Sequence, residues 1–475
     1  MTNPRRAKIV CTLGPATSSY NMIEKLVHAG MDVARLNFSH GSHEDRARMV
    51  AAVRRASARY EKPIGVLADL QGPKIRTGKL VAGKSVRLRF GQRFTITTRN
   101  ILGTEEGVST TFRALPESVH KDDRILLNDG EVALRVISVH GRDVITQVEN
   151  GGDIGEHKGI NLPGVKLNIP SMTPKDRKDL VSAMAIGADY LAISFVRTAA
   201  DVRAAKQAIA RTGKDTPVIS KLEKPEAIDN LDEILAISDG VMVARGDLGV
   251  EMSPEKVPVV QKQIILKARN ALIPVITATQ MLDSMQKNPR PTRAEASDVA
   301  NAIFDGSDAV MLSAETASGK YPVEAVSIMA RIIEEAEGSI TEFPRPAPQE
   351  KLKVAETVAE LVCHASRELH MKVIAVFTHS GFTARLVSRY RPLVPIVSFS
   401  PEAETRRRMA LIWGVCPRSI PDVHKVDGLA EVAERRLLEE GLVRKGDVIG
   451  IVAGTPMGIR GSTNFMKFHV IGGQG

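Results

Sequence analysis

Residues 190–221, YLAISFVRTAADVRAAKQAIARTGKDTPVISK, contain the pattern that decides the fold. Two short apolar runs, 190–194 and 218–221, flank an amphipathic segment of helical length, residues 199–211. A strand, a helix and a second strand in this order predict a βαβ unit with parallel strands. The same alternation continues on both sides of this stretch, over roughly the first 340 residues.

Eight strand-like runs recur in this part of the chain, and helical patterns such as residues 19–29, 44–59 and 254–270 separate them. An open doubly wound sheet fits the local pattern too, but eight βα units favour a closed (β/α)₈ TIM barrel. The predicted barrel strands are residues 8–13, 33–36, 64–67, 190–194, 218–221, 240–243, 275–277 and 309–312.

Residues 73–166 interrupt this alternation with short strands separated by turn sequences. Asn-Asp-Gly at 128–130 and His-Gly-Arg at 140–142 stand where hairpin turns are expected. We predict an inserted all-β domain, placed to act as a lid because the functional loops of a barrel follow the strand C-termini. Its expected strands are residues 85–90, 94–98, 124–127, 132–139 and 144–148.

A third region follows the proline-rich sequence of residues 344–348, which predicts a stiff linker. Strands expected at 373–378, 396–400, 448–452 and 465–471, with helices at 353–369, 382–390, 402–413 and 428–440, indicate a C-terminal α/β domain. The predicted domains are the barrel at 1–72 and 167–344, the lid at 73–166 and the C-terminal domain at 345–475.

The composition is that of an ordinary globular protein, with 43% hydrophobic and 25% charged residues, which excludes disorder and collagen. The formal charge of +10 suits anionic small molecules at least as well as nucleic acid. Cys11, Cys363 and Cys416 form no CxxC pair, which argues against a disulfide framework or structural zinc. Without a long apolar run or a signal-peptide core, we expect a cytoplasmic protein with no membrane or nucleic-acid partner.

Polar side chains follow six of the predicted barrel strands, at the end of a barrel where active sites form. Each alone is more often a surface ion pair or a helix cap, but six strands with such residues together indicate a site. The residues are Arg35, Asn37, Ser39, His40, Asp69, Gln71, Lys74, Arg76, Lys221, Glu223, Arg245, Gly246, Asp247, Thr279, Gln280, Ser313, Glu315 and Thr316.

The residue types indicate a reaction class. Glu223 and Asp247, on neighbouring strands, suit Mg²⁺ or Mn²⁺ with positions left open for substrate oxygens. Arg35, Arg76 and Lys221 suit a phosphate, and the glycine before Asp247 lets a carboxylate approach the backbone. There is no Walker motif, so we predict metal-assisted chemistry on a small phosphorylated acid.

Six motifs, in order along the barrel, resemble those of the pyruvate kinase family. They are KIVCTLGP at 8–15, ARLNFSHG at 34–41, KLEKPE at 221–226, ARGDLGVE at 244–251, ATQML at 278–282 and RPTRAE at 290–295. The resemblance weakens in the inserted and C-terminal domains. It implies a homotetramer that transfers the phosphoryl group of phosphoenolpyruvate to ADP, giving pyruvate and ATP at the end of glycolysis.

The resemblance also implies individual roles. Glu223 and Asp247 match the divalent-metal ligands, and Lys221 matches the cation that stabilises the phosphoryl group in transfer. Ser313 and Glu315 match positions on the proton path to the enolate, whose donor the sequence leaves open. The matching phosphoenolpyruvate contacts are Arg35, Lys221, the Gly246 and Asp247 amides, and Thr279; the matching nucleotide contacts are Asn37, Phe38, Ser39, His40, Arg76 and Lys175.

The chain departs from the family pattern at two positions. A monovalent-cation requirement goes with a glutamate where this chain has Lys74, so we hypothesise that the Lys74 ammonium replaces K⁺. Ala314 stands where the family usually has glycine, and its methyl group can shift the neighbouring Ser313 and Glu315. The positions that match the usual monovalent-cation cage are Asn37, Ser39, Asp69 and Leu70.

The family places its effectors in the C-terminal domain. Thr378, Ser380, Gly381 and Thr383 lie between a predicted strand and helix, where they can cradle the phosphate of a sugar phosphate or AMP. An ordinary capped turn fits this loop equally well, and the glycine-rich residues 454–461 are expected to form only a turn.

Other conspicuous residues are expected to be structural. Cys11, Trp413 and the pair Met281 and Met285 fit core packing, and the arginines at 406–408 fit a solvated helix face. Two alternative functions stay open. A metal-dependent lyase or aldolase for pyruvate-like acids would share the metal pair, whereas a non-catalytic sensor would lack at least one of Lys221, Glu223, Asp247 and Thr279.

Overall fold

The alternating apolar and amphipathic segments fold into eight parallel strands that close into a barrel, which confirms the predicted fold class. The computed structural model describes residues 5–165, 169–343, 353–421, 428–456 and 462–473. The strands follow the order β1-β16-β15-β14-β13-β12-β3-β2 around the barrel. They are β1 (Lys8–Leu13), β2 (Val33–Asn37), β3 (Gly65–Asp69), β12 (Tyr190–Ile193), β13 (Val218–Leu222), β14 (Gly240–Ala244), β15 (Val275–Ala278) and β16 (Ala309–Leu312).

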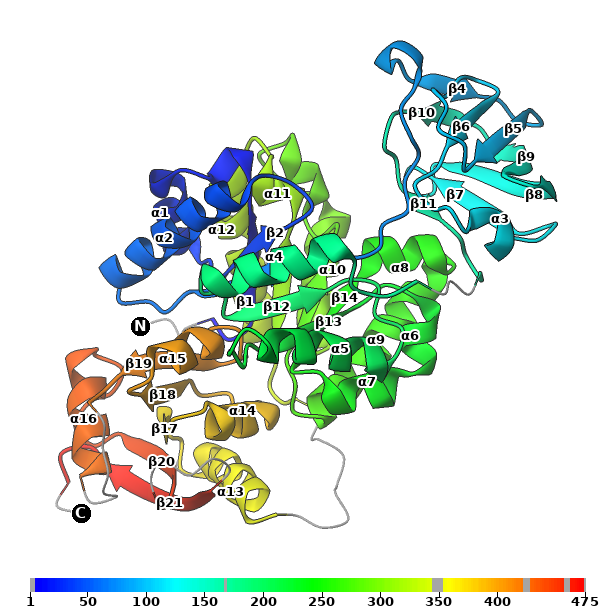
Figure 1. Ribbon diagram of the computed structural model, residues 1–475. Helices are drawn as coiled ribbons and strands as arrows, with labels where there is room; N and C mark the ends of the chain where they lie inside the picture. Colours follow the sequence, from blue (N-terminus) through cyan, green and yellow to red (C-terminus); the bar gives the residue numbers. More distant parts are fainter. Residues whose placement is uncertain (1–4, 166–168, 344–352, 422–427, 457–461, 474–475) are drawn as a thin grey trace.

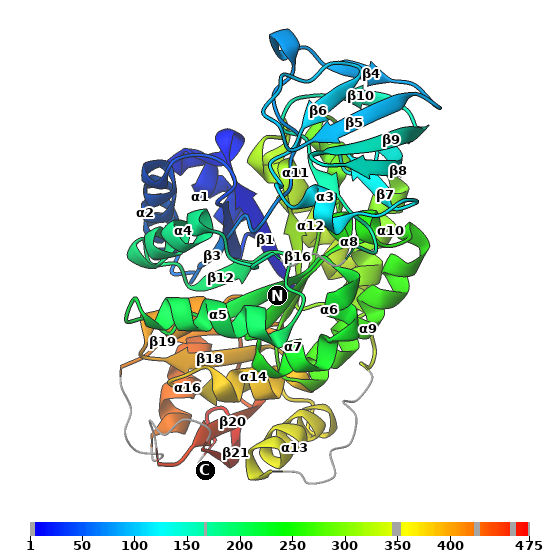
Figure 2. The same ribbon diagram turned by 45° about the vertical axis from the view of Figure 1, so that its right-hand side comes forward.

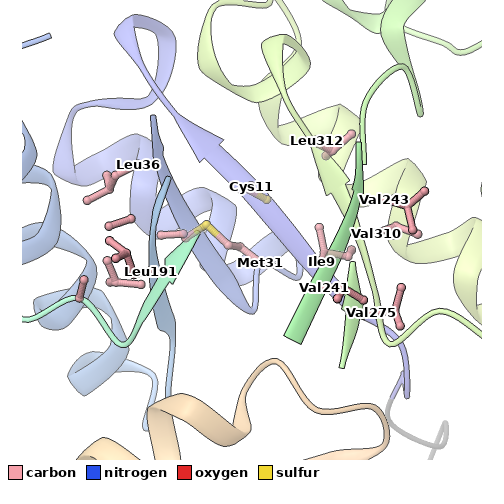
Figure 3. Close-up of a cluster of buried hydrophobic side chains, with 14 of the residues drawn as sticks. Ile9, Cys11, Met31, Leu36, Leu191, Val241, Val243, Val275, Val310 and Leu312 are labelled. Carbon is pink, nitrogen blue, oxygen red and sulfur yellow. The ribbon is translucent and has the colours of Figure 1, made fainter. Parts of the chain in front are cut away.

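Helices surround the barrel because each carries one apolar stripe that packs on the strands. The core between them is aliphatic (Figure 3), and Cys11 is fully buried in it, so burial raises the pKa of its thiol. Cys11 is therefore a core residue, as expected. The helices are α1 (Tyr20–Ala29), α2 (His43–Arg59), α4 (Pro174–Ala185), α5 (Ala199–Ala210), α6 (Pro225–Asp229), α7 (Leu231–Ile237), α8 (Arg245–Glu251), α9 (Val257–Asn270), α10 (Arg293–Phe304), α11 (Ala314–Ala317) and α12 (Pro322–Gly338).

Four aspartates organise the base of the barrel, where the strands begin. Each directly precedes a strand, and its carboxylate accepts the backbone N–H of a residue at or near the start of an adjacent strand at 2.8–2.9 Å. All four also bind cations, so this end is a structural layer of charged groups. The carboxylate and amide pairs are Asp32 with Ile9, Asp189 with Val66, Asp239 with Val218 and Asp308 with Val275.

The inserted domain follows β3 and stands at the opposite end of the barrel from the C-terminal domain (Figures 1 and 2). Its two sheets have the orders β10-β4 and β11-β7-β8-β9-β5-β6. All five predicted strands are present, whereas β6, β10 and β11, each of two or three residues, were missed because they are too short to show alternation. The strands are β4 (Val86–Leu88), β5 (Arg93–Thr97), β6 (Gly107–Ser109), β7 (Arg124–Leu127), β8 (Val132–His140), β9 (Asp143–Asn150), β10 (Gly152–Ile154) and β11 (Ile160–Asn161), with one short helix, α3 (Leu115–Ser118).

The C-terminal domain is a five-stranded sheet in the order β19-β18-β17-β20-β21, with only β21 antiparallel. The sequence missed β19 because residues 402–413 were expected as one long helix, yet α15 ends at Met409 and a turn leads into the strand. The elements are α13 (Val354–Glu368), β17 (Val373–Phe377), α14 (Phe382–Arg389), β18 (Ile396–Ser400), α15 (Ala403–Met409), β19 (Val415–Ser419), α16 (Leu429–Glu439), β20 (Val448–Gly454) and β21 (Thr463–Val470).

This domain docks on the base of the barrel, where Leu411 and Trp413 join the barrel's hydrophobic clusters and polar contacts add to them. Lys8 Nζ donates to Val415 O at 2.8 Å, and Arg407 Nε donates to Asp189 Oδ1 at 2.7 Å. The expectation that the arginines at 406–408 form a solvated helix face is therefore wrong. Their helix faces the barrel, a long-range contact that local charge patterning does not reveal.

The predicted domain limits at 166/167 and 344/345 lie outside the described residues, as do the proline-rich linker and much of the 454–461 segment. The domain limits therefore stay predictions. Among the described helices, none combines the length and apolar character needed to cross a bilayer.

Candidate active site

Lys221 lies at the centre of a buried charge cluster at the C-terminal end of the barrel strands. Its Nζ is 2.7 Å from Glu223 Oε1 and 3.5 Å from Asp69 Oδ1, and it donates a 2.7 Å hydrogen bond to Ser194 Oγ. Burial alone would lower the pKa of Lys221, but the carboxylates of Asp69, Glu223 and Asp247 outweigh burial and raise it. The lysine therefore keeps its positive charge at neutral pH.

Asp69 joins this lysine to the arginine of β2. Arg35 Nε donates to Asp69 Oδ2 at 2.7 Å, and Arg35 Nη1 donates to Thr12 Oγ1 at 2.9 Å. Thr12 and Ser194 were missed as site residues, although both lie at the C-terminal end of a predicted strand and carry a hydroxyl group. With them, all eight strands contribute a polar group to this end of the barrel.

Glu223 and Asp247 provide oxygen ligands of the kind that Mg²⁺ prefers. Glu223 is 1% exposed, and its Oε2 accepts the Phe195 N–H at 2.8 Å. Burial raises the pKa of Glu223, the Lys221 ammonium lowers it, and Asp247 is near enough to raise it further. No group of three or more acidic, histidine or cysteine side chains in the described residues forms a complete metal cage. Two carboxylates with open positions fit a cation that retains water and binds substrate oxygens.

Thr279 and Gly246 face each other across the ends of β15 and β14. The Gly246 N–H donates to Thr279 Oγ1 at 2.7 Å. Thr279 has a φ of +70°, a left-handed conformation that a β-branched residue rarely adopts, so the surrounding contacts must hold it. Arg245 supplies one of those contacts, since its Nη2 donates to Thr279 O at 2.7 Å. Arg245 is itself held by Asp298, whose Oδ1 lies 2.7 Å from its Nη1.

Ser313 and Glu315 follow β16 and belong to the same end of the barrel. Both Glu315 oxygens accept backbone N–H groups, from Ser313 at 2.7 Å and from Leu282 at 3.2 Å. Burial raises the pKa of Glu315, and these amides oppose the rise. Glu315 therefore connects the loop after β15 to the loop after β16. Ala314, the first residue of α11, lies between Ser313 and Glu315.

The predicted nucleotide contacts fall into two groups. Lys175 Nζ donates to Phe38 O at 2.7 Å and pairs with Asp179, which places it beside the loop of Asn37, Ser39 and His40 on the barrel. Arg76 lies in the lid, where its Nη1 donates to His157 O at 2.8 Å. The structure thus brings the barrel members together and leaves Arg76 on the other side of the hinge.

The residues predicted at the monovalent-cation positions make separate contacts in the structure. Asn37 Oδ1 accepts the Ser39 N–H at 3.0 Å, and Asp69 pairs with Arg35 and Lys221. Among the described residues, no ion pair joins Lys74 to Asp69. Lys74 instead lines a small cavity of about 40 Å³ between lid and barrel, together with Leu162, Phe195 and Asp247. Leu70 is buried beside these positions, its N–H bonded to Ala192 O at 3.0 Å.

One carboxylate holds both sides of the lid hinge. Asp176 is fully buried. Its carboxylate accepts a hydrogen bond from the Gly72 N–H, which precedes the lid, at 3.1 Å. It also accepts hydrogen bonds from the N–H and the hydroxyl group of Thr173, which follows the lid, at 2.8 and 2.6 Å. Gly72 has a φ of +70°, and a Cβ there would lie 2.9 Å from Phe195 Cδ2, so the hinge requires glycine. Asp176 was not predicted as a site residue, although a Thr-Pro-Lys-Asp capping box marks it.

We expect Asp176→Ala to loosen the hinge. Hydrogen exchange of the Gly72 amide should accelerate at least about tenfold, and the free energy of unfolding should fall by about 1–3 kcal/mol, because a buried acceptor and a helix cap are lost. Asp201→Ala is the matched control, since Asp201 completes the same capping box at α5 without touching the hinge. Mass spectrometry measures the exchange rate. Equal rates at the Gly72 amide in the two variants would contradict the role of Asp176 in holding the hinge.

The predicted effector loop forms an internally bonded turn in the structure. Thr378 Oγ1 accepts the Gly381 N–H at 3.0 Å, and the buried Thr383 hydroxyl bonds the Thr463 hydroxyl at 2.7 Å. Ser380 and Gly381 line an adjacent cavity of about 710 Å³. The effector role of this loop stays a prediction.

At the C-terminal end of the barrel strands, Lys221 pairs with Glu223 and Arg35 pairs with Asp69, and the inserted β domain stands at the same end. These features define a phosphoryl-transfer enzyme of the barrel class. Comparison with known proteins identifies the family. Residues 4–326 match the description "Pyruvate kinase, barrel domain" and residues 356–469 match "Pyruvate kinase, alpha/beta domain". The chain belongs to the pyruvate kinase family.

Individual relatives agree over nearly the whole chain. The chain is 45% identical to a pyruvate kinase of Geobacillus stearothermophilus, covering 98% of this chain and 80% of that protein. It is 46% identical to one of Mycobacterium tuberculosis, covering 98% and 99%. A crystal structure of a pyruvate kinase from Cryptosporidium parvum superposes with a TM-score of 0.92 at 38% identity, over 98% of this chain and 96% of that one.

The function predicted from the sequence is thereby confirmed. The protein transfers the phosphoryl group of phosphoenolpyruvate to ADP, which yields pyruvate and ATP in glycolysis. The lyase and sensor alternatives are set aside, because relatives of both high identity and high coverage are pyruvate kinases.

Proposed function

We propose that the charge cluster around Lys221 is the phosphoryl-transfer centre of this enzyme. The observation that carries the proposal is the buried Lys221 ammonium, 2.7 Å from Glu223 and linked through Asp69 to Arg35. In this assignment Arg35 and Lys221 bind the phosphoryl oxygens, and the Gly246 and Asp247 amides with Thr279 bind the substrate carboxylate. Glu223 and Asp247 hold Mg²⁺ or Mn²⁺, which when bound polarises the substrate oxygens.

The bond changes assign work to each group. The bond from phosphorus to the enol oxygen of phosphoenolpyruvate breaks, and a bond forms to a β-phosphate oxygen of ADP, with Lys221 and Arg35 stabilising the charge between them. The enolate that remains takes a proton at its methylene carbon. Thr279 with a positioned water can deliver it, and the buried Glu315 keeps the Ser313 and Leu282 loops in place for this step. Asn37, Phe38, Ser39, His40 and Lys175 hold the nucleotide, and Arg76 reaches it from the lid.

Pyruvate release from phosphoenolpyruvate and ADP with Mg²⁺ tests the assignment. Release should require all three components and produce ATP in equal amount. Release of pyruvate without ADP would contradict phosphoryl transfer to the nucleotide at this centre, and would point to hydrolysis or a lyase reaction.

We also propose that Lys74 makes K⁺ dispensable. Lys74 stands at the junction of lid and barrel, in the cavity that Asp247 also lines, where an ammonium can take the place of a monovalent cation. Initial rates in buffers with K⁺ or with a bulky organic cation should be equal. Lys74→Glu should lower the K⁺-free rate at least about tenfold and regain it on addition of K⁺. Strong activation of the unmodified enzyme by K⁺ would contradict the proposal.

Family membership further supports a homotetramer. β21 forms a free edge of its sheet, and its Phe468 and Val470 side chains are 42% and 48% exposed. Such an edge suits strand pairing or side-chain contacts between copies of the chain. Light scattering should give four times the mass of one chain, and a monomer mass at micromolar concentration would contradict the assembly. Regulation by a sugar phosphate or AMP is part of this proposal, with Thr378, Ser380, Gly381 and Thr383 as the predicted contacts.

A further inference from the structure

The end of α8 carries a buried glutamate to which the catalytic assignment gives no role. Glu251 is the last residue of this helix and is 5% exposed. Its Oε1 accepts two hydrogen bonds, from Lys224 Nζ at 2.6 Å and from Asn161 Nδ2 at 2.8 Å. A buried carboxylate is costly unless it is paired and hydrogen-bonded, so the position of Glu251 depends on these two partners.

The three side chains of this contact come from three separate parts of the chain. Lys224 directly follows Glu223, at the end of β13. Glu251 lies one helical turn after Asp247, on the same side of α8. Asn161 belongs to β11, in the lid. The Glu251 carboxylate therefore joins the two loops that carry the proposed metal ligands, and it joins both of them to the lid.

Lys224 also lies beside the residue that holds Glu223. The Lys224 Nζ is 5.9 Å from the centre of the Phe195 ring, and the Phe195 N–H donates to Glu223 Oε2 at 2.8 Å. The same ring packs against the lid hinge, since a Cβ on Gly72 would lie 2.9 Å from Phe195 Cδ2. Lys224 is thus enclosed where the Glu223 loop, the hinge and α8 meet.

The lid approaches the end of α8 at a second place, and the inserted domain stands beside this helix in both views (Figures 1 and 2). The turn between β7 and β8 brings Gly130 close to α8, because a Cβ built on this glycine would lie 3.8 Å from Val250 Cγ1. This second approach is apolar. Within the described part of the chain, the bond from Asn161 to Glu251 is the hydrogen bond that joins the lid to α8.

We propose that Glu251 is a positioning residue for phosphoryl transfer. Through Lys224 it fixes the separation of the loops that carry Glu223 and Asp247. Through Asn161 it makes that separation depend on the place of the lid, because a lid that moves away removes a donor from a buried carboxylate. The inference rests on the proposed role of Glu223 and Asp247 as the metal ligands.

Binding of Mn²⁺ without substrates, measured by electron paramagnetic resonance, tests the contact between the two loops. Lys224→Met removes the ammonium and keeps most of the length of the side chain. We expect the dissociation constant of Mn²⁺ to rise at least about tenfold, as it does when other groups that orient metal ligands are removed. Charge alone predicts the opposite, because a metal site that loses a neighbouring cation binds Mn²⁺ more tightly. Unchanged or tighter binding would overturn the proposal.

Two variants of Glu251 separate its position from its charge. Glu251→Gln keeps an oxygen that can accept both hydrogen bonds, so the affinity for Mn²⁺ should stay within about threefold. Glu251→Ala removes the acceptor and should weaken Mn²⁺ binding at least about tenfold. Glu337→Ala is the matched control, since Glu337 is also 5% exposed but lies at the base of the barrel. Equal losses in the two Glu251 variants would assign the effect to charge and overturn the proposal; if Glu251→Ala fails to fold, Lys224→Met decides.

An exchange of donor and acceptor tests the lid contact. Asn161→Asp places a second carboxylate beside Glu251 and should lower kcat at least about fivefold, because like charges drive the lid away from α8. N161D/E251Q restores one donor and one acceptor in reversed places, and kcat should return to within about twofold of the unmodified enzyme. Asn150→Asp is the matched control, since Asn150 Nδ2 donates to Glu131 O inside the lid. A normal kcat in Asn161→Asp, or no recovery in N161D/E251Q, would overturn the proposal.

Glu223→Gln separates this inference from the metal assignment on which it rests. If Mn²⁺ binding weakens in Glu223→Gln but not in Lys224→Met, the ligand assignment stands and the positioning role of Glu251 is refuted. If Glu223→Gln leaves Mn²⁺ binding unchanged, the metal assignment itself is refuted, and the inference about Glu251 is refuted with it.

Discussion

Lys221→Met should lower kcat for pyruvate formation by about 10³-fold or more. The variant keeps most of the length of the side chain but removes the ammonium that contacts Glu223, Asp69 and Ser194. A preorganised cation at a phosphoryl centre typically contributes 10³–10⁵-fold, because it acts in a site from which water is excluded. A coupled assay of pyruvate release measures the loss.

Proton exchange separates the role of Lys221 from a general collapse of the site. Exchange of the pyruvate methyl protons with D₂O, followed by NMR, should survive in Lys221→Met, since the groups assigned to protonation remain. Lys62→Met is the matched control, because Lys62 pairs with the buried Asp32 at the other end of the barrel. It should lower stability and leave kcat nearly intact. A Lys221→Met enzyme of normal kcat would refute the assignment.

Glu223→Gln should raise the Mg²⁺ concentration needed for half-maximal activity at least about tenfold and lower kcat about 10²–10³-fold. The substitution preserves shape and can keep the Phe195 N–H bond, but it removes a negative charge from a site that retains Lys221. Binding of Mn²⁺, measured by electron paramagnetic resonance without substrates, reports the ligand loss independently of turnover.

A buried carboxylate elsewhere provides the comparison. Glu337→Gln alters a glutamate that is also buried, accepts the Ala7 N–H at 2.6 Å and pairs with Arg6 at the base of the barrel. It should change stability without affecting Mn²⁺ binding. If Glu223→Gln binds Mn²⁺ as tightly as the unmodified enzyme, Glu223 is not a metal ligand, and its contact with Lys221 becomes its main role.

Much of the catalytic end could be predicted because its residues follow the barrel strands directly. Lys221 and Glu223 are two positions apart at the end of β13, so their meeting is a local consequence of strand geometry. Thr12 and Ser194 were missed because single hydroxyl residues at strand ends are common. Asp176 was missed because its capping role is visible in sequence but its bond to Gly72, 104 positions away, is not.

The sequence by itself determined the barrel, the inserted domain and the chemical types at the strand ends. Those features depend on the period of two in a strand, the 3.6-residue period of a helix and the turn residues between them, all of which are local. The tertiary structure decided which charges meet. Asp69 lies between Arg35 and Lys221, and the arginines of α15 face the barrel instead of solvent, because closure of the barrel and docking of the C-terminal domain bring distant segments together. Partnerships of this kind depend on packing across hundreds of residues, which no local pattern records.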